Sequence, residues 1–239
     1  MSRTINLSRR LTNVASFIPK GARFADIGSD HAYLPCYVCL HDEEAEGIAG
    51  EVNEGPFQSA QDTVNRYDLS NRVDVRLGDG LDVIENGEID LVVVAGMGGS
   101  LIKTILDEGQ ARLSRVKRIV VQPNIDEPGL RYWLQWHGYT ITDEGMVEEN
   151  GHIYEIIAAD KDSTGQELTE RQLLFGPIIL NQRPDPFYRK WRREYVKRRR
   201  IIDQMTQAAE PDHDKIGTFK RELAWIEEVL HDDNDHSQY

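Results

Sequence analysis

Acidic side chains follow three successive apolar stretches of the chain, each beside a glycine or a short polar residue. Asp26 ends the first stretch, and Asp30 lies two residues beyond Gly28. Glu51 ends the second stretch, and Asp79 follows the third. If these stretches are parallel strands, their carboxyl ends meet at one edge of a sheet, where ligands bind. The pattern therefore indicates a ligand with positive charge or sugar hydroxyl groups.

The loop after the first stretch distinguishes two kinds of nucleotide ligand. In a dinucleotide site, a G-x-G-x-x-G loop lets the backbone approach a pyrophosphate. Here Asp30 stands where the second glycine is expected, and its carboxylate would repel a phosphate. A sulfonium cation with an amino-acid tail suits acidic surroundings. Glu51 lies 23 residues after Gly28, near the distance at which an acid meets ribose in either kind of site.

Each acidic residue also has an ordinary structural explanation. Asp26 could cap a turn, Glu51 could be a solvated strand end, and Asp79 could cap a helix. A histidine at a helix start, such as His31, is as often structural as ligand-binding. Arg9 and Arg10 are candidates for phosphate or carboxylate contacts, and as surface charges they would also be ordinary.

A glycine-rich run, Ala95-Gly96-Met97-Gly98-Gly99, follows the fourth apolar stretch. Enzymes that methylate exocyclic amines of bases usually carry an Asp/Asn-Pro-Pro-aromatic run here, and this chain has no such side chains. Glycines let the backbone approach a flat substrate or a methyl group, and Met97 offers a soft apolar wall. The alternative is a strand-to-helix turn without a ligand.

The elements that must position these residues alternate along the chain. We predict strands at 22–27, 46–52, 73–77, 89–95 and 118–122, with helices at 55–68, 99–108 and 126–137. This alternation predicts a doubly wound parallel sheet. Asn150-Gly151 then separates two strand-like runs, which indicates a hairpin. A last strand delivered by a hairpin favours the α/β, Rossmann-like fold of class I methyltransferases, with a seven-stranded, mostly parallel sheet.

A change of pattern divides the chain. We predict a first domain over 1–160, a linker over the Gly- and Pro-punctuated segment 161–186, and a C-terminal domain over 187–239. Apolar residues of that last part follow an a/d spacing interrupted by Arg198, and they resume after Pro211. The spacing predicts an antiparallel helical hairpin resembling a short coiled coil, joined across residues 208–212.

Charge is unevenly distributed. The net charge of −13 argues against a protein that coats nucleic acid by bulk charge. Residues 1–160 hold 14 basic and 26 acidic side chains, whereas 183–200 hold nine basic and two acidic ones. The basic run is either a solvated helix face or a surface for nucleic acid.

The sequence shows neither a membrane span nor a signal-peptide core, so we expect a cytoplasmic protein. Cys36 and Cys39 lie in an apolar run and are expected to be buried structural thiols, not half of a metal site.

These features together resemble the bacterial TrmK family, the tRNA (adenine-22-N1) methyltransferases. The matching segments are Leu7-Ser8-Arg9-Arg10-Leu11, Asp26 to Pro35, Gly50-Glu51-Val52, Gly55-Pro56-Phe57, Gly78-Asp79-Gly80-Leu81, Ala95 to Gly99, Gln122-Pro123-Asn124, Trp133-Leu134 and Gly138-Tyr139. The resemblance implies that Asp26, Gly28, Asp30 and His31 line the methionine end of S-adenosylmethionine. It also implies that Glu51 meets the ribose and that Asp79 and Gly80 meet the adenine.

The resulting site expectation has three parts. The residues expected to bind the cofactor are Arg10, Asp26, Gly28, Asp30, His31, Glu51, Val52, Asn53, Asp79, Gly80, Ala95 and Gly96. The residues expected to face the reacting base are Met97, Gly98 and Asn124. The residues expected to contact tRNA are Arg9, Arg189, Lys190, Arg192, Arg193, Lys197, Arg198 and Arg199.

The expected reaction is direct methyl transfer to N1 of adenine 22, the position being supplied by the resemblance alone. N1 has an in-plane lone pair, so no base has to remove a proton before attack. N1 is also on the Watson–Crick edge, so the adenine must be unpaired or flipped out. We expect tRNA as partner, no metal, no membrane and a monomer. Two alternatives remain: a module that binds S-adenosylmethionine and acts on a protein partner through the hairpin, and a small-molecule methyltransferase.

Overall fold

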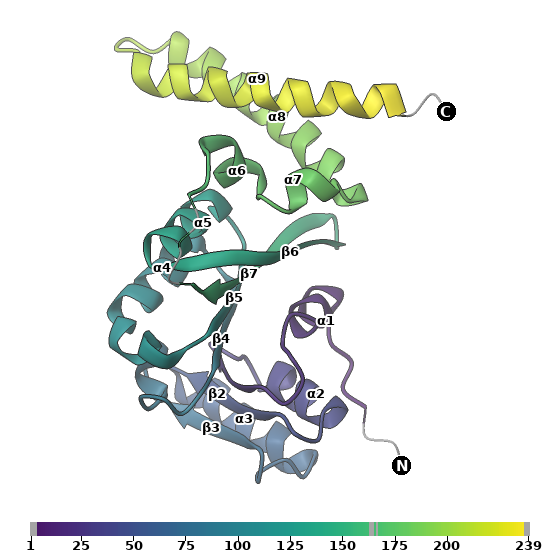
Figure 1. The fold of residues 1–239 in the computed structure, drawn as a ribbon, viewed down its shortest axis with the longest axis vertical. Helices are drawn as coiled ribbons and strands as arrows, with labels where there is room; N and C mark the ends of the chain where they lie inside the picture. Colours follow the sequence, from purple (N-terminus) through teal and green to yellow (C-terminus); the bar gives the residue numbers. More distant parts are fainter. Residues whose placement is uncertain (1–3, 163–164, 166, 237–239) are drawn as a thin grey trace. The chain divides into compact units, whose positions relative to one another are not determined.

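The computed structural model describes residues 4–162, 165 and 167–236. The chain forms two compact units, Met1–Glu167 and Leu168–Tyr239 (Figure 1). The division therefore falls inside the segment 161–186 that we expected to be a linker. The physical reason is Phe175, which is fully buried and lies with its ring 4.4 Å from that of Trp191, so the residues around it belong to the second unit.

The first unit is built on a seven-stranded sheet with the order β3-β2-β1-β4-β5-β7-β6. Strands β1 to β5 are parallel, and β7 runs antiparallel to both β5 and β6. This confirms the seven-stranded, mostly parallel sheet. The strands are β1 (Arg23–Ile27), β2 (Glu46–Glu51), β3 (Val73–Leu77), β4 (Leu91–Met97), β5 (Arg118–Pro123), β6 (Tyr139–Glu149) and β7 (His152–Lys161).

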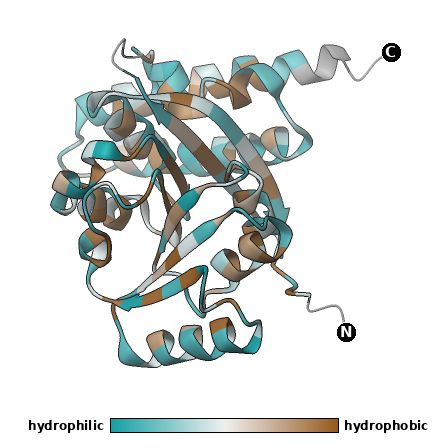
Figure 2. Ribbon diagram, turned by 60° about the horizontal axis from the view of Figure 1, so that its bottom comes forward, coloured by the Kyte–Doolittle hydropathy of each residue, from teal (hydrophilic) through white to brown (hydrophobic). Residues whose placement is uncertain are grey.

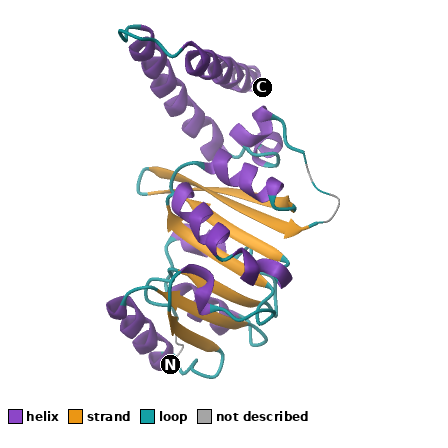
Figure 3. Ribbon diagram, turned by 90° about the vertical axis from the view of Figure 1, so that its left-hand side faces the viewer, coloured by secondary structure: helices purple, strands orange, loops and turns teal. Residues whose placement is uncertain are grey.

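The central strands are apolar because they are covered on both faces. Residues Leu91 to Val94 of β4 are all buried, as a parallel strand between two layers of helices requires. Hydrophobic residues concentrate on the strands (Figure 2), and helices lie on both sides of the sheet (Figure 3). The helices are α1 (Arg9–Ala15), α2 (Tyr33–His41), α3 (Glu54–Arg66), α4 (Gly99–Glu108) and α5 (Glu127–Trp136), with 3-10 turns η1 (Gly80–Val83) and η2 (Gln110–Arg115).

Side chains of α1, α2 and α3 share one core cluster with the sheet. Cys36 and Cys39 of α2 belong to it, are fully buried and are not disulfide-bonded. Burial raises the pKa of the Cys36 thiol to about 12 and that of Cys39 to about 11, so neither is a reactive thiolate. The expectation of buried structural thiols is confirmed.

The β6–β7 hairpin turns where the sequence predicted. Asn150 and Gly151 both have positive φ angles, 50° and 77°, which a two-residue hairpin turn of type I′ needs. Beneath the hairpin, Arg131 of α5 donates to the carboxylates of Glu144 and Glu155, and the side chains of all three are fully buried. This ion cluster ties α5 to the two strands.

The second unit contains α6 (Glu170–Phe175), α7 (Ile179–Gln182), α8 (Asp185–Thr206) and α9 (His213–His236). The two long helices pack along each other as a hairpin. Trp191 and Ile202 of α8 and Ile216 and Ile226 of α9 are buried, as the predicted spacing requires. Within the described part of the chain, no helix is long and apolar enough to cross a membrane.

Candidate active site

Backbone hydrogen bonds join the carboxyl ends of β1, β2 and β3. The N–H groups of Gly28 and Ser29 donate to the Gly50 carbonyl at 2.9 and 3.2 Å, and the Gly78 N–H donates to the Glu51 carbonyl at 2.8 Å. These bonds fix the first turn against β2 and the third loop against the end of β2. The structure therefore brings the three acidic strand ends to one edge of the sheet.

The loop after β1 has an unusual backbone. Asp30, His31 and Ala32 follow each other with φ angles of 47°, 74° and 56°, a left-handed conformation that costs energy in non-glycine residues. Asp30 thus adopts the conformation that a second glycine would adopt easily. Gly28 also has a positive φ of 69°, and a Cβ built on it would lie 2.2 Å from Met97 Cε. Glycine is favoured here by its positive φ, and a larger residue would also displace the end of the Met97 side chain.

Asp26 is a buried acid at the end of β1, with 4% of its surface exposed. Burial raises its pKa to about 7, and the nearby Glu51 carboxylate adds to this rise. A hydrogen bond from Ser29 Oγ at 2.7 Å and the charge of Arg10 act in the opposite direction. The pKa of this carboxyl is therefore raised toward neutral pH, and a bound cation would favour its charged form.

Glu51 is buried as well, which argues against a merely solvated strand end. Burial raises its pKa, while the backbone N–H groups of Asp30 and His31 lower it by hydrogen bonding to the carboxylate. The other oxygen, Oε1, is buried without a hydrogen-bond partner among the described residues. A buried acceptor without a donor is costly, and the hydroxyls of a ribose supply the donors that it lacks. The chemistry of this carboxylate fits an adenosyl ligand.

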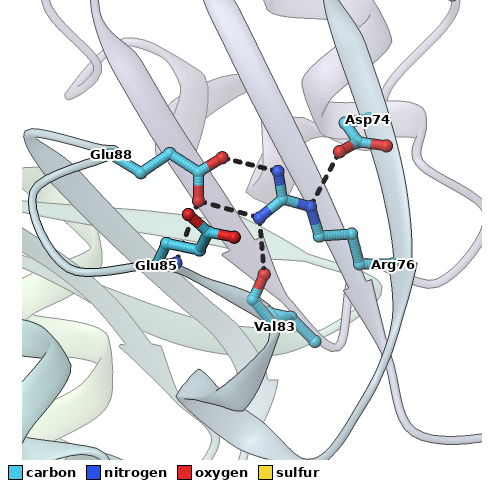
Figure 4. Close-up of polar contacts among 5 residues, drawn as sticks. All are labelled: Asp74, Arg76, Val83, Glu85 and Glu88. Carbon is cyan, nitrogen blue, oxygen red and sulfur yellow. Dashed lines mark hydrogen bonds and ion pairs between the residues drawn. The ribbon is translucent and has the colours of Figure 1, made fainter.

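Asp79 begins the loop that follows β3 and is exposed. It precedes η1 but makes no side-chain capping bond, so helix capping does not explain it. The loop is held by Arg76 of β3, which donates to the Val83 carbonyl at 2.8 Å and to both oxygens of Glu88 (Figure 4). The carboxylates of Glu88 and Asp74 raise the pKa of this guanidinium, so it stays positively charged.

The loops after β4 and β5 form the other half of the edge. Gly96 lies at an irregularity in the β4–β5 ladder and has a φ of 80°. Its N–H donates to Gln122 Oε1 at 3.1 Å, and its carbonyl accepts from Asn124 Nδ2 at 2.7 Å. The Asn124 N–H donates to the Met97 carbonyl at 2.8 Å. The residues expected to face the base are thus held in one rigid loop pair.

Arg10 of α1 reaches the same loop pair. Its guanidinium donates to Gln122 Oε1 and lies 5.6 Å from the centre of the Tyr154 ring. A Cβ built on Gly96 would lie 3.3 Å from Arg10 Nη1, which places the guanidinium directly over this glycine. Arg10 therefore stands at the edge that holds the acids, whereas Arg9 is exposed and bonds Glu149 through its backbone N–H.

Several exposed apolar side chains lie at or soon after the carboxyl ends of strands in the sequence. Most of the large hydrophobic side chains that are exposed in the described residues follow the strand ends in sequence: Tyr33, Val52, Leu77, Leu101 and Ile125. Water-exposed apolar groups around a few buried acids are typical of a site that binds a flat, partly apolar ligand. Of the remaining residues expected at the cofactor, Asn53 is exposed, and His31 is half-buried with Nε2 3.3 Å from Asp30 Oδ1.

The basic residues expected to contact tRNA, apart from Arg9, lie on α8 in the second unit. Arg189, Arg192, Arg193, Lys197 and Arg199 are exposed, and Lys190 is half-buried beside Trp191. Arg198 differs from the expectation. Its side chain is only 14% exposed, and its guanidinium pairs with Glu194 and with Glu222 of α9 at 2.9 Å. Arg198 occupies a position in the a/d spacing of α8 where an apolar residue is expected. Its side chain therefore faces α9 rather than solvent.

Two residues of the edge were not among those expected at the site. Gln122 is fully buried, and its Oε1 accepts hydrogen bonds from both Arg10 and the Gly96 N–H. These three residues meet only in the folded chain. Its signal in the sequence was a polar residue at the end of an otherwise apolar strand. Ile125 was missed because an apolar residue in a loop carries no pattern.

Among the described residues, no group of three or more His, Cys, Asp or Glu side chains could hold a metal ion.

The arrangement suits a ligand with an adenosyl group and a sulfonium charge, and the comparisons with known proteins identify the family of the chain. The family model described as TrmK, tRNA (adenine(22)-N(1))-methyltransferase, matches residues 24–228. A Bacillus subtilis protein named tRNA (adenine(22)-N(1))-methyltransferase is 41% identical over 236 residues, which cover 97% of this chain and 98% of the relative.

Solved structures of similar chains share the fold. Streptococcus pneumoniae Sp1610 in complex with S-adenosyl-L-methionine matches with a TM-score of 0.85 and 37% identity over 95% of this chain and 100% of that one. M. capricolum TrmK in complex with S-adenosyl-homocysteine matches with a TM-score of 0.81 and 26% identity over 94% of this chain and 98% of that one. From its sequence, its fold and this strand-end architecture, the chain belongs to the TrmK family of tRNA (adenine(22)-N(1))-methyltransferases.

Proposed function

We propose that the protein transfers a methyl group from S-adenosylmethionine to N1 of adenine 22 in tRNA. The observation that carries the proposal is the pair of buried carboxylates, Asp26 and Glu51, at adjacent strand ends, with Glu51 Oε1 lacking a hydrogen-bond donor among the residues that the structure describes. The membership in the TrmK family and the relatives solved with S-adenosylmethionine and S-adenosyl-homocysteine support it.

The proposed cofactor contacts follow from the chemistry of each group. Glu51 accepts the ribose hydroxyls, with Val52 and Asn53 beside it, and Asp79 and Gly80 lie at the adenine. Asp26, Asp30 and His31 surround the charged methionine end, and Gly28 leaves room for it. Arg10, placed over Gly96, offers a positive charge for the cofactor carboxylate. Ala95 and Gly96 are the remaining residues proposed to contact the cofactor.

The reaction needs alignment more than acid or base chemistry. When bound, S-adenosylmethionine supplies an electrophilic methyl group. The N1 lone pair of adenine forms the new N–C bond as the C–S bond breaks toward sulfur, and the adenine takes up the positive charge. Met97, Gly98 and Asn124 hold the base in line and exclude water from it. Since no proton leaves N1 before attack, the absence of a general base from our proposed base-facing residues is consistent with the reaction.

The substrate contacts are proposed from charge. Arg189, Lys190, Arg192, Arg193, Lys197 and Arg199 of α8 bind tRNA phosphates, together with Arg9 of the first unit. Such contacts fix the position of the RNA and carry no sequence information themselves. We propose a cytoplasmic location, which is consistent with a tRNA substrate. Because the proposed reacting groups come from one chain, we propose that a monomer is sufficient for the reaction.

The test is a methylation assay with labelled S-adenosylmethionine and tRNA transcripts, followed by mapping of the modified nucleoside. We expect 1-methyladenosine at position 22 and no incorporation when adenine 22 is replaced by guanine. Glu51→Gln should weaken the affinity for S-adenosylmethionine about 10- to 100-fold, because a charged hydrogen-bond acceptor is removed.

Glu54→Gln is the matched control, since Glu54 is an exposed acid three residues further along the chain and should leave the affinity unchanged. Lack of methyl incorporation into any tRNA by the wild-type protein would refute the proposed function. A cofactor that binds normally under those conditions would point instead to a binding module.

A further inference from the structure

Ile125 and Leu101 are exposed apolar residues that closely follow the two loops proposed to face the base, and we call this pair the apolar shelf. Ile125 lies between Asn124 and the start of α5 and is 68% exposed, and Leu101 lies in the first turn of α4 and is 52% exposed. Neither side chain contributes to the core. An apolar side chain that stays in water next to a binding site is a candidate contact for a ligand.

The backbone of the shelf is fixed on both sides. The Gly99 N–H donates to the Ile125 carbonyl at 3.0 Å, and the preceding Asn124 N–H donates to the Met97 carbonyl at 2.8 Å. The next residue, Asp126, caps α5 and accepts from Lys103 Nζ of α4 at 2.6 Å. The Ile125 side chain therefore projects from a rigid frame and does not need to be ordered when a ligand arrives.

The shelf continues the surface already assigned to the base. A Cβ built on Gly98 would lie 4.0 Å from Ile125 Cγ1, so the isoleucine borders this glycine directly. A Cβ on Gly99 would lie 2.7 Å from the Ile125 carbonyl, which shows how closely the two loops approach. A flat group resting on the Gly98 backbone would have Ile125 against it.

A base that leaves the stack of a tRNA helix loses its apolar neighbours, and an enzyme that acts on it must replace them. We propose that the apolar shelf holds the target adenine in the flipped-out position, with Ile125 as the main positioning residue and Leu101 supporting it. This inference rests on the proposed function, since it concerns the same reaction. It also gives a reason why these two apolar side chains remain exposed next to the loops proposed to face the base.

The test combines variants of the shelf with two tRNA substrates. In one substrate adenine 22 is paired with uracil, and in the other the opposite nucleotide is changed so that adenine 22 is mismatched. We expect Ile125→Ser to lower the single-turnover methylation rate about 10- to 50-fold on the paired substrate, because the adenine has less apolar surface to rest on. The decrease should be smaller on the mismatched substrate, because an unpaired base costs less to flip.

The other measurements separate this role from a structural one. Ile125→Leu should restore the rate, and Ile125→Ser should leave the dissociation constant of S-adenosyl-homocysteine unchanged. Leu101→Ser, on a different element, should show the same dependence on pairing with a smaller decrease. The matched control is Trp136→Ala, which removes an apolar side chain that is 73% exposed at the far end of α5 and should methylate at the wild-type rate.

Equal rates for wild type, Ile125→Ser and Leu101→Ser on the paired substrate would overturn the inference while leaving the proposed function intact. So would a decrease that is the same on both substrates, since this indicates a general defect of the active site. If Ile125→Ser does not fold, Leu101→Ser tests the inference in its place. A decrease that is not larger on the paired substrate would then overturn it. Failure of the wild-type protein to methylate either tRNA would instead remove the proposed function.

Discussion

Asp26 is the residue whose ionisation departs furthest from that of an acid in water among the groups of the candidate site. Its pKa of about 7 reflects burial first, and Glu51 is the acidic side chain that adds to the rise. Ser29 donates a hydrogen bond to the carboxylate, and Arg10 contributes the nearby positive charge. A cationic ligand in this environment would supply further positive charge, so binding should favour release of the proton near neutral pH.

Asp26 also makes stability depend on pH. Because folding raises its pKa from 3.8 to about 7, the native state keeps a proton that the unfolded chain releases between these values. The contribution of this group to the free energy of unfolding is therefore full below pH 4 and is lost as the pH rises to 7. Asp26→Asn abolishes this dependence, and its stability relative to wild type should rise by about 4 kcal/mol between pH 4 and pH 8.

Urea unfolding at a series of pH values measures this difference. Asp90→Asn is a control of opposite sign, since Lys117 and Arg23 lower the pKa of Asp90 and its contribution is lost as the pH falls. Parallel stability profiles for wild type and Asp26→Asn would contradict the assignment of the proton to Asp26.

At the scale of elements, the loop between β3 and β4 depends on one guanidinium. Arg76 contacts Asp74 on its own strand, Val83 at the end of η1 and Glu88 before β4 (Figure 4). The Val83 side chain also fills the space that a Cβ on Gly50 or Gly78 would need, at 2.8 and 2.9 Å. The loop that presents Asp79 is thus held from behind by both charge and packing.

Arg76→Met should therefore affect the ligand as well as the fold. We expect it to weaken the affinity for S-adenosyl-homocysteine about tenfold, because Glu88 and the Val83 carbonyl lose a shared donor and the loop loosens. Calorimetric titration measures the affinity. Arg23→Met is the control, since Arg23 pairs with Asp90 at the opposite end of β1 and should leave the affinity unchanged. If Arg76→Met and Arg23→Met weaken the affinity equally, loosening of the β3–β4 loop is not the cause of the loss.

Arg198 shows how an element can change the meaning of a charged residue. At the level of composition it is one of nine basic residues between 183 and 200. In the hairpin it pairs with Glu194 and Glu222 and lies 5.6 Å from the centre of the Trp191 ring. A polar residue at a seam position can fix the register of two helices. Arg198 is therefore a structural residue of the hairpin.

At the scale of the whole molecule, the first unit is strongly acidic and the second carries a concentrated basic surface. Exposed basic residues of α8 are spaced so that several share one face of the helix: Arg189, Arg192, Arg193, Lys197 and Arg200. Binding of a polyanion by such a face releases counterions and depends strongly on salt. We propose this face of α8 as the local surface for nucleic acid in a protein whose net charge is −13.

Replacing Arg192, Arg193 and Lys197 with alanine should weaken tRNA binding and reduce its salt dependence by about one unit of log–log slope for each phosphate that is no longer neutralised. The affinity for S-adenosylmethionine should not change. Filter binding at several salt concentrations measures both the affinity and the slope. A matched control removes three exposed basic residues of the first unit, Lys20, Arg66 and Lys117. An equal weakening in this control would mean that α8 has no special role.

Local patterns predicted the elements because their physical causes are local. The turn at Asn150-Gly151 needs two positive φ angles that these residue types adopt easily, and the hairpin forms there. The strands and helices began within about two residues of their expected positions because apolar periodicity and turn residues act over short distances. The second unit begins inside the segment expected to be a linker, before the expected start of the C-terminal domain at 187, because Phe175 packs on Trp191 only in the folded chain.

The sequence by itself determined the sheet, its acidic strand ends and the charged helix, since each of these depends on residue type and spacing. Asp30 in place of a second glycine already argued for a cationic ligand without phosphate. Only the tertiary structure decided that burial raises the pKa of Asp26, that Glu51 Oε1 lacks a donor among the described residues and that Arg198 faces α9. Burial and pairing depend on residues far apart in the chain, and no local pattern contains them.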